Sequence, residues 1–202
     1  MSTARAHYDR IAQRILAAHP APDLRGITVL LPNMHAARPL AQALARNAGV
    51  PALLLPQMVT LDAWAQTVPL TTPVATECQR SALLYQHLRK QQWFDNADLW
   101  GMTQELLLLF DELTLALGAL PADAESFAAV VQQAYAARQN VALQLEARLV
   151  FELWHAMQQG SELDRARARQ QRLALLAQQA ASPLYVLRSS EWDAVERRFL
   201  DA

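Results

Sequence analysis

Residues 27–56 read ITVLLPNMHAARPLAQALARNAGVPALLLP, and this stretch decides the fold. A short apolar run, 27–31, ends at Pro32, a stretch with helical spacing follows, and a second apolar run, 52–55, ends at Pro56. This order predicts a strand, a tight turn, a helix and a second strand. Because the helix has to cross over, the two strands should lie parallel in one sheet.

The turn after the first predicted strand is where nucleotide-binding proteins hold phosphates. Here it contains Pro32, Asn33, Met34 and His35 and continues to Arg38. It has no glycine, no lysine and no Gly-Lys-Ser/Thr ending, although a phosphate loop needs glycines for close backbone approach and a lysine for charge. We therefore expect a degenerate phosphate loop and no bound cofactor.

Composition limits the possible classes of protein. The 202 residues fit one domain with an insert or two small domains, and a hydrophobic content of 52% with 7% aromatics favours helices built from Leu and Ala. A formal net charge of −1 excludes a generally basic surface, so any DNA contact needs a local patch. One cysteine excludes a disulfide framework and a multi-cysteine zinc site.

The N-terminal residues lack the apolar core of a signal peptide, and no apolar run approaches the roughly 20 residues that cross a membrane. We expect a cytoplasmic protein with no membrane partner.

Helical spacing recurs along the rest of the chain. A first helix is predicted over 4–18, Asn33 is expected to cap the next helix, which stops at Gly49, and Thr60 is expected to cap a short one. Between residues 73 and 181 no strand is expected. Four or five helices are predicted there, over 74–91 after a Thr72 cap, 96–117, 123–138, 141–159, and from a Ser161 cap to 181.

A third buried strand is predicted over 184–187, followed by a last helix capped by Ser190. The expected domains are 1–72 as the first part of an α/β domain, 73–181 as a helical insertion, and 182–202 as the return to the sheet. A sheet of three strands looks unfinished, so we expect a fragment of a longer chain.

Several motifs point to chemistry that the surrounding pattern does not support. The run 106–110 followed by Asp111-Glu112 mimics a Walker B motif, but the apolar spacing predicts a helix with two solvated carboxylates. Glu152 and His155 have the spacing of di-iron sites, yet no second copy exists, and we expect no metal site. Cys78 is expected to be a buried or half-buried structural thiol.

Arg165, Arg169 and Arg172 are predicted on one side of their helix. Three arginines on one side can bind phosphates. The alternative is an ordinary solvated face, because charged residues usually point outward.

Residues 27–44 and 51–65 (ITVLLPNMHAARPLAQAL and PALLLPQMVTLDAWA) resemble the start of the AddB-type helicase-nuclease subunits, whose N-terminal region is an inactivated superfamily I helicase. The shared pattern is an apolar strand ending in Leu-Pro, a polar turn, an Ala- and Arg-rich helix, a strand ending in Leu-Pro, and a Thr-Leu-Asp turn. The specific pattern is confined to the first 65 residues.

The resemblance implies an α/β fold, with a small P-loop-NTPase-like sheet and a large all-helical insertion. It implies a non-catalytic helicase-like module of a DNA double-strand break repair enzyme, which scaffolds the complex, contacts a motor helicase subunit and guides DNA. The nuclease of that family lies far downstream of this region. Weak binding of single-stranded or forked DNA is expected. The candidate contacts are Asn33, His35, Arg38 and Thr60 at the sheet edge and Arg165, Arg169 and Arg172 in the insertion.

Two alternatives stay open. One is a nucleotide-binding enzyme domain with a degenerate loop, and the other is a protein-interaction module unrelated to DNA.

Overall fold

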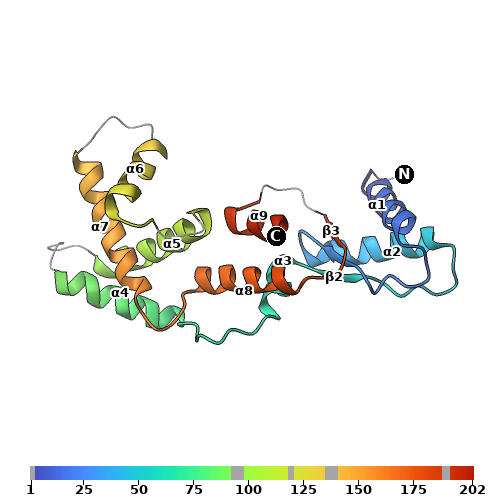
Figure 1. Ribbon diagram of the computed structural model, residues 1–202, viewed down its shortest axis with the longest axis horizontal. Coiled ribbons are helices and arrows are strands. Elements are labelled where there is room, and N and C mark those ends of the chain that lie inside the picture. Colours follow the sequence, from blue (N-terminus) through green and yellow to red (C-terminus); the bar gives the residue numbers. More distant parts are fainter. Residues whose placement is uncertain (1–2, 92–97, 118–120, 135–140, 188–191) are drawn as a thin grey trace. The chain divides into compact units, whose positions relative to one another are not determined.

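The computed structural model describes residues 3–91, 98–117, 121–134, 141–187 and 192–202, which form helices and one small sheet (Figure 1). The chain divides into two compact units. The sheet unit comprises Met1–Val68 and Leu176–Glu191, and the helical unit comprises Pro69–Leu175 and Trp192–Ala202. The predicted boundaries at 72/73 and 181/182 stay a prediction.

The sheet has three parallel strands in the order β2-β1-β3. They are β1 (Thr28–Leu30), β2 (Gln57–Val59) and β3 (Leu184–Val186). The central strand β1 is buried throughout, and its Val29 lies opposite Met58 on one side and Tyr185 on the other. The predicted small parallel sheet within a mostly helical chain is therefore confirmed, including the positions of the first and third strands. The expected burial of the third strand is wrong, because Leu184 and Tyr185 are half-buried and Val186 is 39% exposed.

The predicted second strand, 52–55, is wrong, because β2 begins two residues beyond it. Leu54 instead exchanges backbone hydrogen bonds with the segment before β1, from Leu24 N to Leu54 O (2.9 Å) and from Leu54 N to Pro22 O (2.9 Å). A turn closed by the bond from Ile27 N to Leu24 O (3.2 Å) then interrupts this pairing ahead of β1. The ladder can resume only at Gln57, opposite Thr28. Leu54 and Leu55 are left exposed.

Helices α1 (Thr3–Ala18) and α2 (Ala37–Ala48) pack against each other in the sheet unit. Gly49 ends α2 in the left-handed region (φ 64°), where glycine has no Cβ penalty, as the sequence predicts. The short helix α3 (Leu61–Gln66) follows β2. The core of this unit is built from buried residues of α1, β1, α2 and their connections: Ala12, Ile15, Leu24, Ile27, Val29, Leu31, Ala36, Leu40, Ala43 and Leu44.

The helical unit has its own apolar core. Its helices are α4 (Glu77–Gln91), α5 (Leu99–Leu117), α6 (Ala124–Ala134), α7 (Val141–Gln158), the first part of α8 (Arg165–Gln179), and α9 (Ala194–Asp201). The core is Leu84, Leu88, Leu107, Phe110, Phe127, Ala147, Phe151, Leu153 and Trp154. No helix in the described ranges is long and apolar enough to cross a membrane.

Two predicted helix starts are wrong for one shared reason. Residues on either side of the α4–α7 segment are extended and pair with each other, through Leu163 N to Pro73 O (2.8 Å) and Ala75 N to Leu163 O (2.9 Å). Helix α4 therefore begins after Thr76, whose hydroxyl accepts from Gln79 N, and not after Thr72.

Helix α8 likewise begins after Asp164, which accepts from Arg167 N, and not after Ser161. At the last helix, Ser190 lies outside the described residues. Asp193 caps α9 in a capping box with Glu196, and Trp192 precedes the helix.

Candidate functional site

The candidate site lies where β1 and β2 end, at the carboxyl edge of the sheet. Leu31 N donates to Val59 O (2.8 Å), and Leu187 N donates to Leu30 O (2.8 Å). The turn that starts at Pro32 and the turn at Thr60 therefore leave the sheet side by side. Open parallel sheets bind their ligands at this edge.

The turn after β1 uses its own backbone donors. Asn33 is extended, and its side-chain oxygen accepts from His35 N (3.1 Å). Ala36 N donates to Asn33 O (3.2 Å), and Ala37 N donates to Met34 O, which closes a 3-10 turn η1 (Met34–Ala36). Asn33 thus caps η1, whereas α2 itself has no side-chain cap. In a phosphate loop such N–H groups point at the ligand, but here three of them already have acceptors inside the turn.

The polar side chains at this edge differ in whether they already form a hydrogen bond or an ion pair. His35 and Arg38 are exposed, and within the described residues neither side chain forms a hydrogen bond or an ion pair. Thr60 caps α3 as predicted, with its hydroxyl oxygen accepting from Ala63 N (3.3 Å). The structure therefore brings Asn33, His35, Arg38 and Thr60 to one edge, and leaves His35 and Arg38 as its two unengaged basic groups.

The predicted arginine side of α8 belongs to the helical unit and is largely engaged. Arg169 Nη1 donates to Asp193 Oδ2 (3.1 Å), and Arg169 Nη2 donates to Glu196 Oε1 (2.9 Å). Arg172 also has an interaction partner, whereas Arg165 is exposed at the first position of the helix. Arg169 thus fastens α8 to the N-terminus of α9. The Asp-x-x-Glu spacing at 193–196 is a capping-box signal, which could have predicted the start of α9 from the sequence but not the ion pairs with Arg169.

The Walker B-like run lies inside helix α5, as the apolar spacing predicts. The expectation of two solvated carboxylates is wrong for Asp111, which accepts from Arg80 Nη2 (2.6 Å) and Nη1 (3.1 Å), while Glu112 is exposed. Sequence reasoning missed this pair because its partners lie on different helices.

The remaining candidate residues are Glu152, His155 and Cys78, and they do not form a metal site in the described part of the chain. Glu152 accepts from Arg148 (3.0 Å), and the His155 ring stacks on Phe151 with a centroid distance of 5.8 Å. No cluster of three metal-ligating side chains exists among the described residues. The prediction for Cys78 is wrong, since this thiol is exposed in the first turn of α4.

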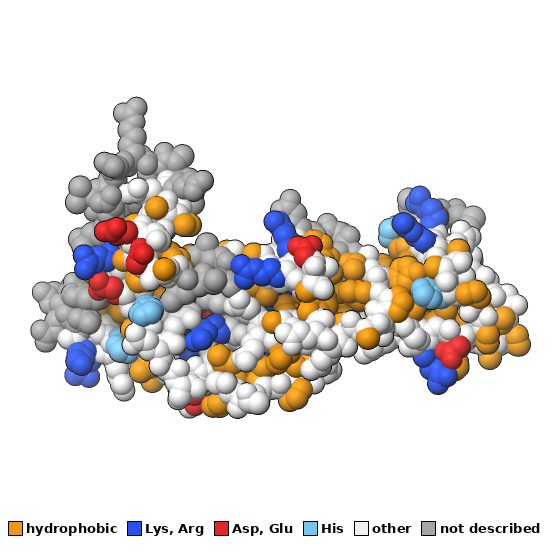
Figure 2. Space-filling model, in the orientation of Figure 1, with side chains coloured by type: hydrophobic (Ala, Val, Ile, Leu, Met, Phe, Trp, Pro, Cys, Tyr) orange, Lys and Arg blue, Asp and Glu red, His pale blue; other side chains and the backbone are white. Residues whose placement is uncertain are grey.

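Basic side chains form no broad patch on the face shown in Figure 2. Within each unit the Lys and Arg side chains stand in small separate groups, several of them beside acidic side chains. The described residues on this face therefore offer few phosphate contacts at a time.

Comparison with known proteins adds no assignment, since no family model and no curated protein matches the chain.

Proposed function

We propose that this chain is a non-catalytic helicase-like module of a DNA double-strand break repair helicase-nuclease. In this proposal the sheet is a degenerate P-loop-NTPase-like core and the helical stretch is the insertion of a helicase domain. The module scaffolds the complex, contacts a motor helicase subunit and guides single-stranded or forked DNA. The observation that supports the proposal is the turn after β1, which joins a buried parallel strand to a helix and contains neither glycine nor lysine.

The alternative hypothesis, a nucleotide-binding enzyme domain, is tested by calorimetry with ATP and magnesium. The turn lacks glycine and lysine, and its N–H groups from His35 to Ala37 have acceptors within the turn. We therefore expect no ATP binding and no hydrolysis. A magnesium-dependent affinity tighter than about 100 μM, equivalent to about 5.5 kcal/mol, would refute the proposal.

DNA guiding is expected to depend on the sheet edge more than on α8. Arg38 and His35 are exposed and unengaged within the described part of the chain. Arg169, in contrast, would have to leave Asp193 and Glu196 before it could reach a phosphate. We expect weak, sequence-independent binding of a single-stranded oligonucleotide that is lost steeply as salt rises.

The matched test is fluorescence anisotropy over a range of salt concentrations with Arg38→Ala and Arg14→Ala. Both substitutions remove one exposed arginine of the sheet unit, but Arg14 lies in α1, where its neighbour Gln13 bonds Asn47 at the C-terminal end of α2, whereas Arg38 lies in the first turn of α2. Arg38→Ala should lower the salt slope by about 0.7, the value for one single-strand phosphate contact, and Arg14→Ala should leave it unchanged. Equal slopes for both variants would show that the sheet edge does not carry the DNA.

The second candidate is a protein-interaction module unrelated to DNA, and the small, separated basic groups among the described residues on the face shown in Figure 2 favour it. Absence of DNA binding at low salt by the folded chain would select this candidate over the first.

A further inference from the structure

Helices α4 and α5 pack against each other, and two side-chain contacts one helical turn apart fix how they pair. Gln104 Nε2 of α5 donates to Ser81 Oγ of α4 (3.2 Å). Four residues later on α4 and four residues earlier on α5, the rings of Tyr85 and Trp100 meet in a T-shaped arrangement with their centroids 5.9 Å apart. The two helices are therefore antiparallel here, and their packing holds the Trp100 ring in place.

The Trp100 side chain is nevertheless 54% exposed. Among the residues that the structure describes, it is the only Phe, Tyr or Trp side chain that is exposed. A T-shaped contact occupies at most one face of an aromatic ring. At least one face of the Trp100 indole is therefore accessible to a flat partner.

Unpaired basic side chains follow Tyr85 on α4. Arg89 lies one turn after Tyr85 on the same side of the helix, and Lys90 is the next residue. Both are exposed, and neither forms a hydrogen bond or an ion pair with any residue that the structure describes. The carboxylate of Asp98, in contrast, is turned to the backbone, where Oδ1 accepts from Trp100 N (3.1 Å) and Gly101 N (3.0 Å). Unpaired positive charge thus lies within one turn of the aromatic pair.

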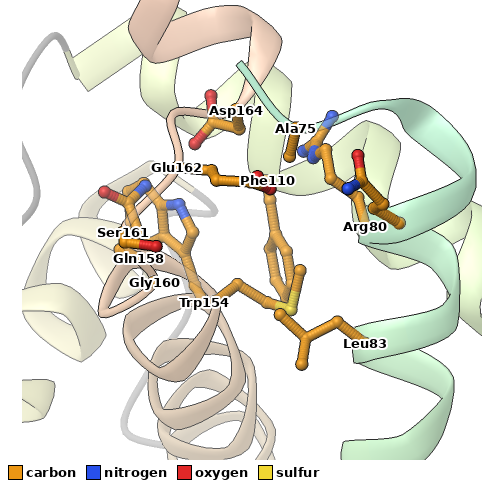
Figure 3. A pocket seen from close by; sticks show the side chains of 12 residues that line it. Ala75, Arg80, Leu83, Phe110, Trp154, Gln158, Gly160, Ser161, Glu162 and Asp164 are labelled. Carbon is orange, nitrogen blue, oxygen red and sulfur yellow. The ribbon is translucent and has the colours of Figure 1, made fainter. Parts of the chain in front are cut away.

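A cavity of about 220 Å³ lies on another side of α4 and is separate from this aromatic pair (Figure 3). Leu83, Phe110 and Trp154 are among its lining residues, whereas neither Tyr85 nor Trp100 lines it. Leu83 and Tyr85 are two positions apart on α4 and therefore point about 200° apart around the helix axis. The aromatic pair belongs to the outer surface of the helical unit.

We propose that Trp100 and Arg89 bind single-stranded DNA, with one base stacked on the open face of the Trp100 indole and a phosphate on Arg89. This inference rests on the proposed function and deepens it, because it gives the DNA strand a contact in the helical unit. Proteins that hold single strands without sequence preference combine aromatic rings, on which bases stack, with basic groups that follow the backbone. The unpaired charge of Arg89 suits a phosphate, whereas burial under an apolar protein surface would leave that charge without a partner.

The test compares two labelled oligonucleotides of equal length by fluorescence anisotropy at low salt, with the full chain. One is oligothymidine, and the other is an abasic strand, which has the phosphates but no bases. The parent chain should bind oligothymidine more tightly than the abasic strand. Trp100→Ala should lower the affinity for oligothymidine at least about fivefold, equivalent to about 1 kcal/mol for one stacked base, and should leave the affinity for the abasic strand unchanged.

Three further variants separate stacking from lost packing and from charge. Trp100→Phe keeps a flat ring and should retain most of the affinity for oligothymidine. The matched control is Leu109→Ala, which removes a 36% exposed apolar side chain from the opposite side of α5 and should change neither affinity. Arg89→Ala should lower the salt slope by about 0.7 for both strands, the value for one phosphate contact.

Two results would overturn this site and leave the proposed function standing. The parent chain binds oligothymidine and the abasic strand equally, or Trp100→Ala binds oligothymidine as tightly as Leu109→Ala does. In either case the exposed indole serves a protein contact. Absence of binding to both strands at low salt by the folded parent chain would instead refute the proposed function together with this site.

Discussion

Replacing Arg169 by methionine tests whether this arginine holds the helical unit together. Its two terminal nitrogens bind Asp193 and Glu196, and the exposed fractions of the three side chains are 21%, 32% and 9%. Removing one partner of a fully buried ion pair costs about 3–5 kcal/mol, because the other charge is left unpaired. Arg169 and Asp193 are partly exposed and hence screened by water. We therefore expect a loss of about 2–3 kcal/mol in the free energy of unfolding of the helical unit.

A second substitution separates the unpaired charge from the lost packing. In the Arg169→Met background, Glu196→Gln removes the nearly buried negative charge and keeps an oxygen that can accept from Asp193 N. This change should recover about 1–2 kcal/mol, whereas Glu196→Gln alone should destabilise the chain. The assay is urea unfolding followed by far-UV circular dichroism, with stability taken from the transition midpoint.

The matched control is Arg165→Met, which removes an exposed arginine from the same helix and should change stability by less than about 0.5 kcal/mol. A loss below about 0.5 kcal/mol for Arg169→Met, or no recovery in the double variant, would refute a structural role for Arg169. If the same variant also lowered the salt slope of DNA binding by about 0.7, the arginine would contact phosphate after all.

Three further predictions concern the sheet unit. Leu40→Ala removes a fully buried side chain of α2 and should cost about 3 kcal/mol in urea unfolding, whereas the exposed neighbour change Gln42→Ala should cost almost nothing. Gly49→Ala forces a Cβ into the left-handed region (φ 64°) and should cost about 1 kcal/mol in the same assay, although the space around it is open. Hydrogen bonds from the Arg25 side chain lower the pKa of Asp23 from 3.8 to about 2. This stabilisation is present above pH 3.8 and is lost as the pH falls towards 2; an NMR titration of the Asp23 carboxyl should therefore give the low value, and Arg25→Ala should raise it.

Apolar runs predict the first and third strands well, because both strands pair along an uninterrupted stretch. They fail for the second strand, since its position depends on the turn at Arg25-Gly26, which lies on its neighbour and not in the run itself. Local hydrogen bonds are readable only in part: Thr60 caps α3 as predicted, whereas the prediction that Asn33 caps the next helix is wrong, because Asn33 caps the turn η1 and α2 has no side-chain cap. Thr72 and Ser161 fail as caps because the pairing of Leu163 with residues 73–75 keeps both segments extended.

The candidate sites show the same division between local and distant information. Helical spacing places Arg169 on the polar side of α8, but spacing alone does not reveal that Asp193 and Glu196 lie opposite it. The pairing of Arg80 with Asp111 joins two helices, and the cavity beside Trp154 needs three helices and a turn. These features depend on tertiary packing, which one sequence does not encode in its periodicity.

The pairing of Leu163 with Pro73 and Ala75 has a consequence for how this protein can change over evolution. The entry and the exit of the α4–α7 segment meet at a single pair of backbone hydrogen bonds. Helices there can lengthen, shorten or be exchanged without moving the two points at which the segment joins its neighbours, and longer loops add little closure entropy. A change in the length of the segment would therefore leave in place the two backbone hydrogen bonds that fix its ends.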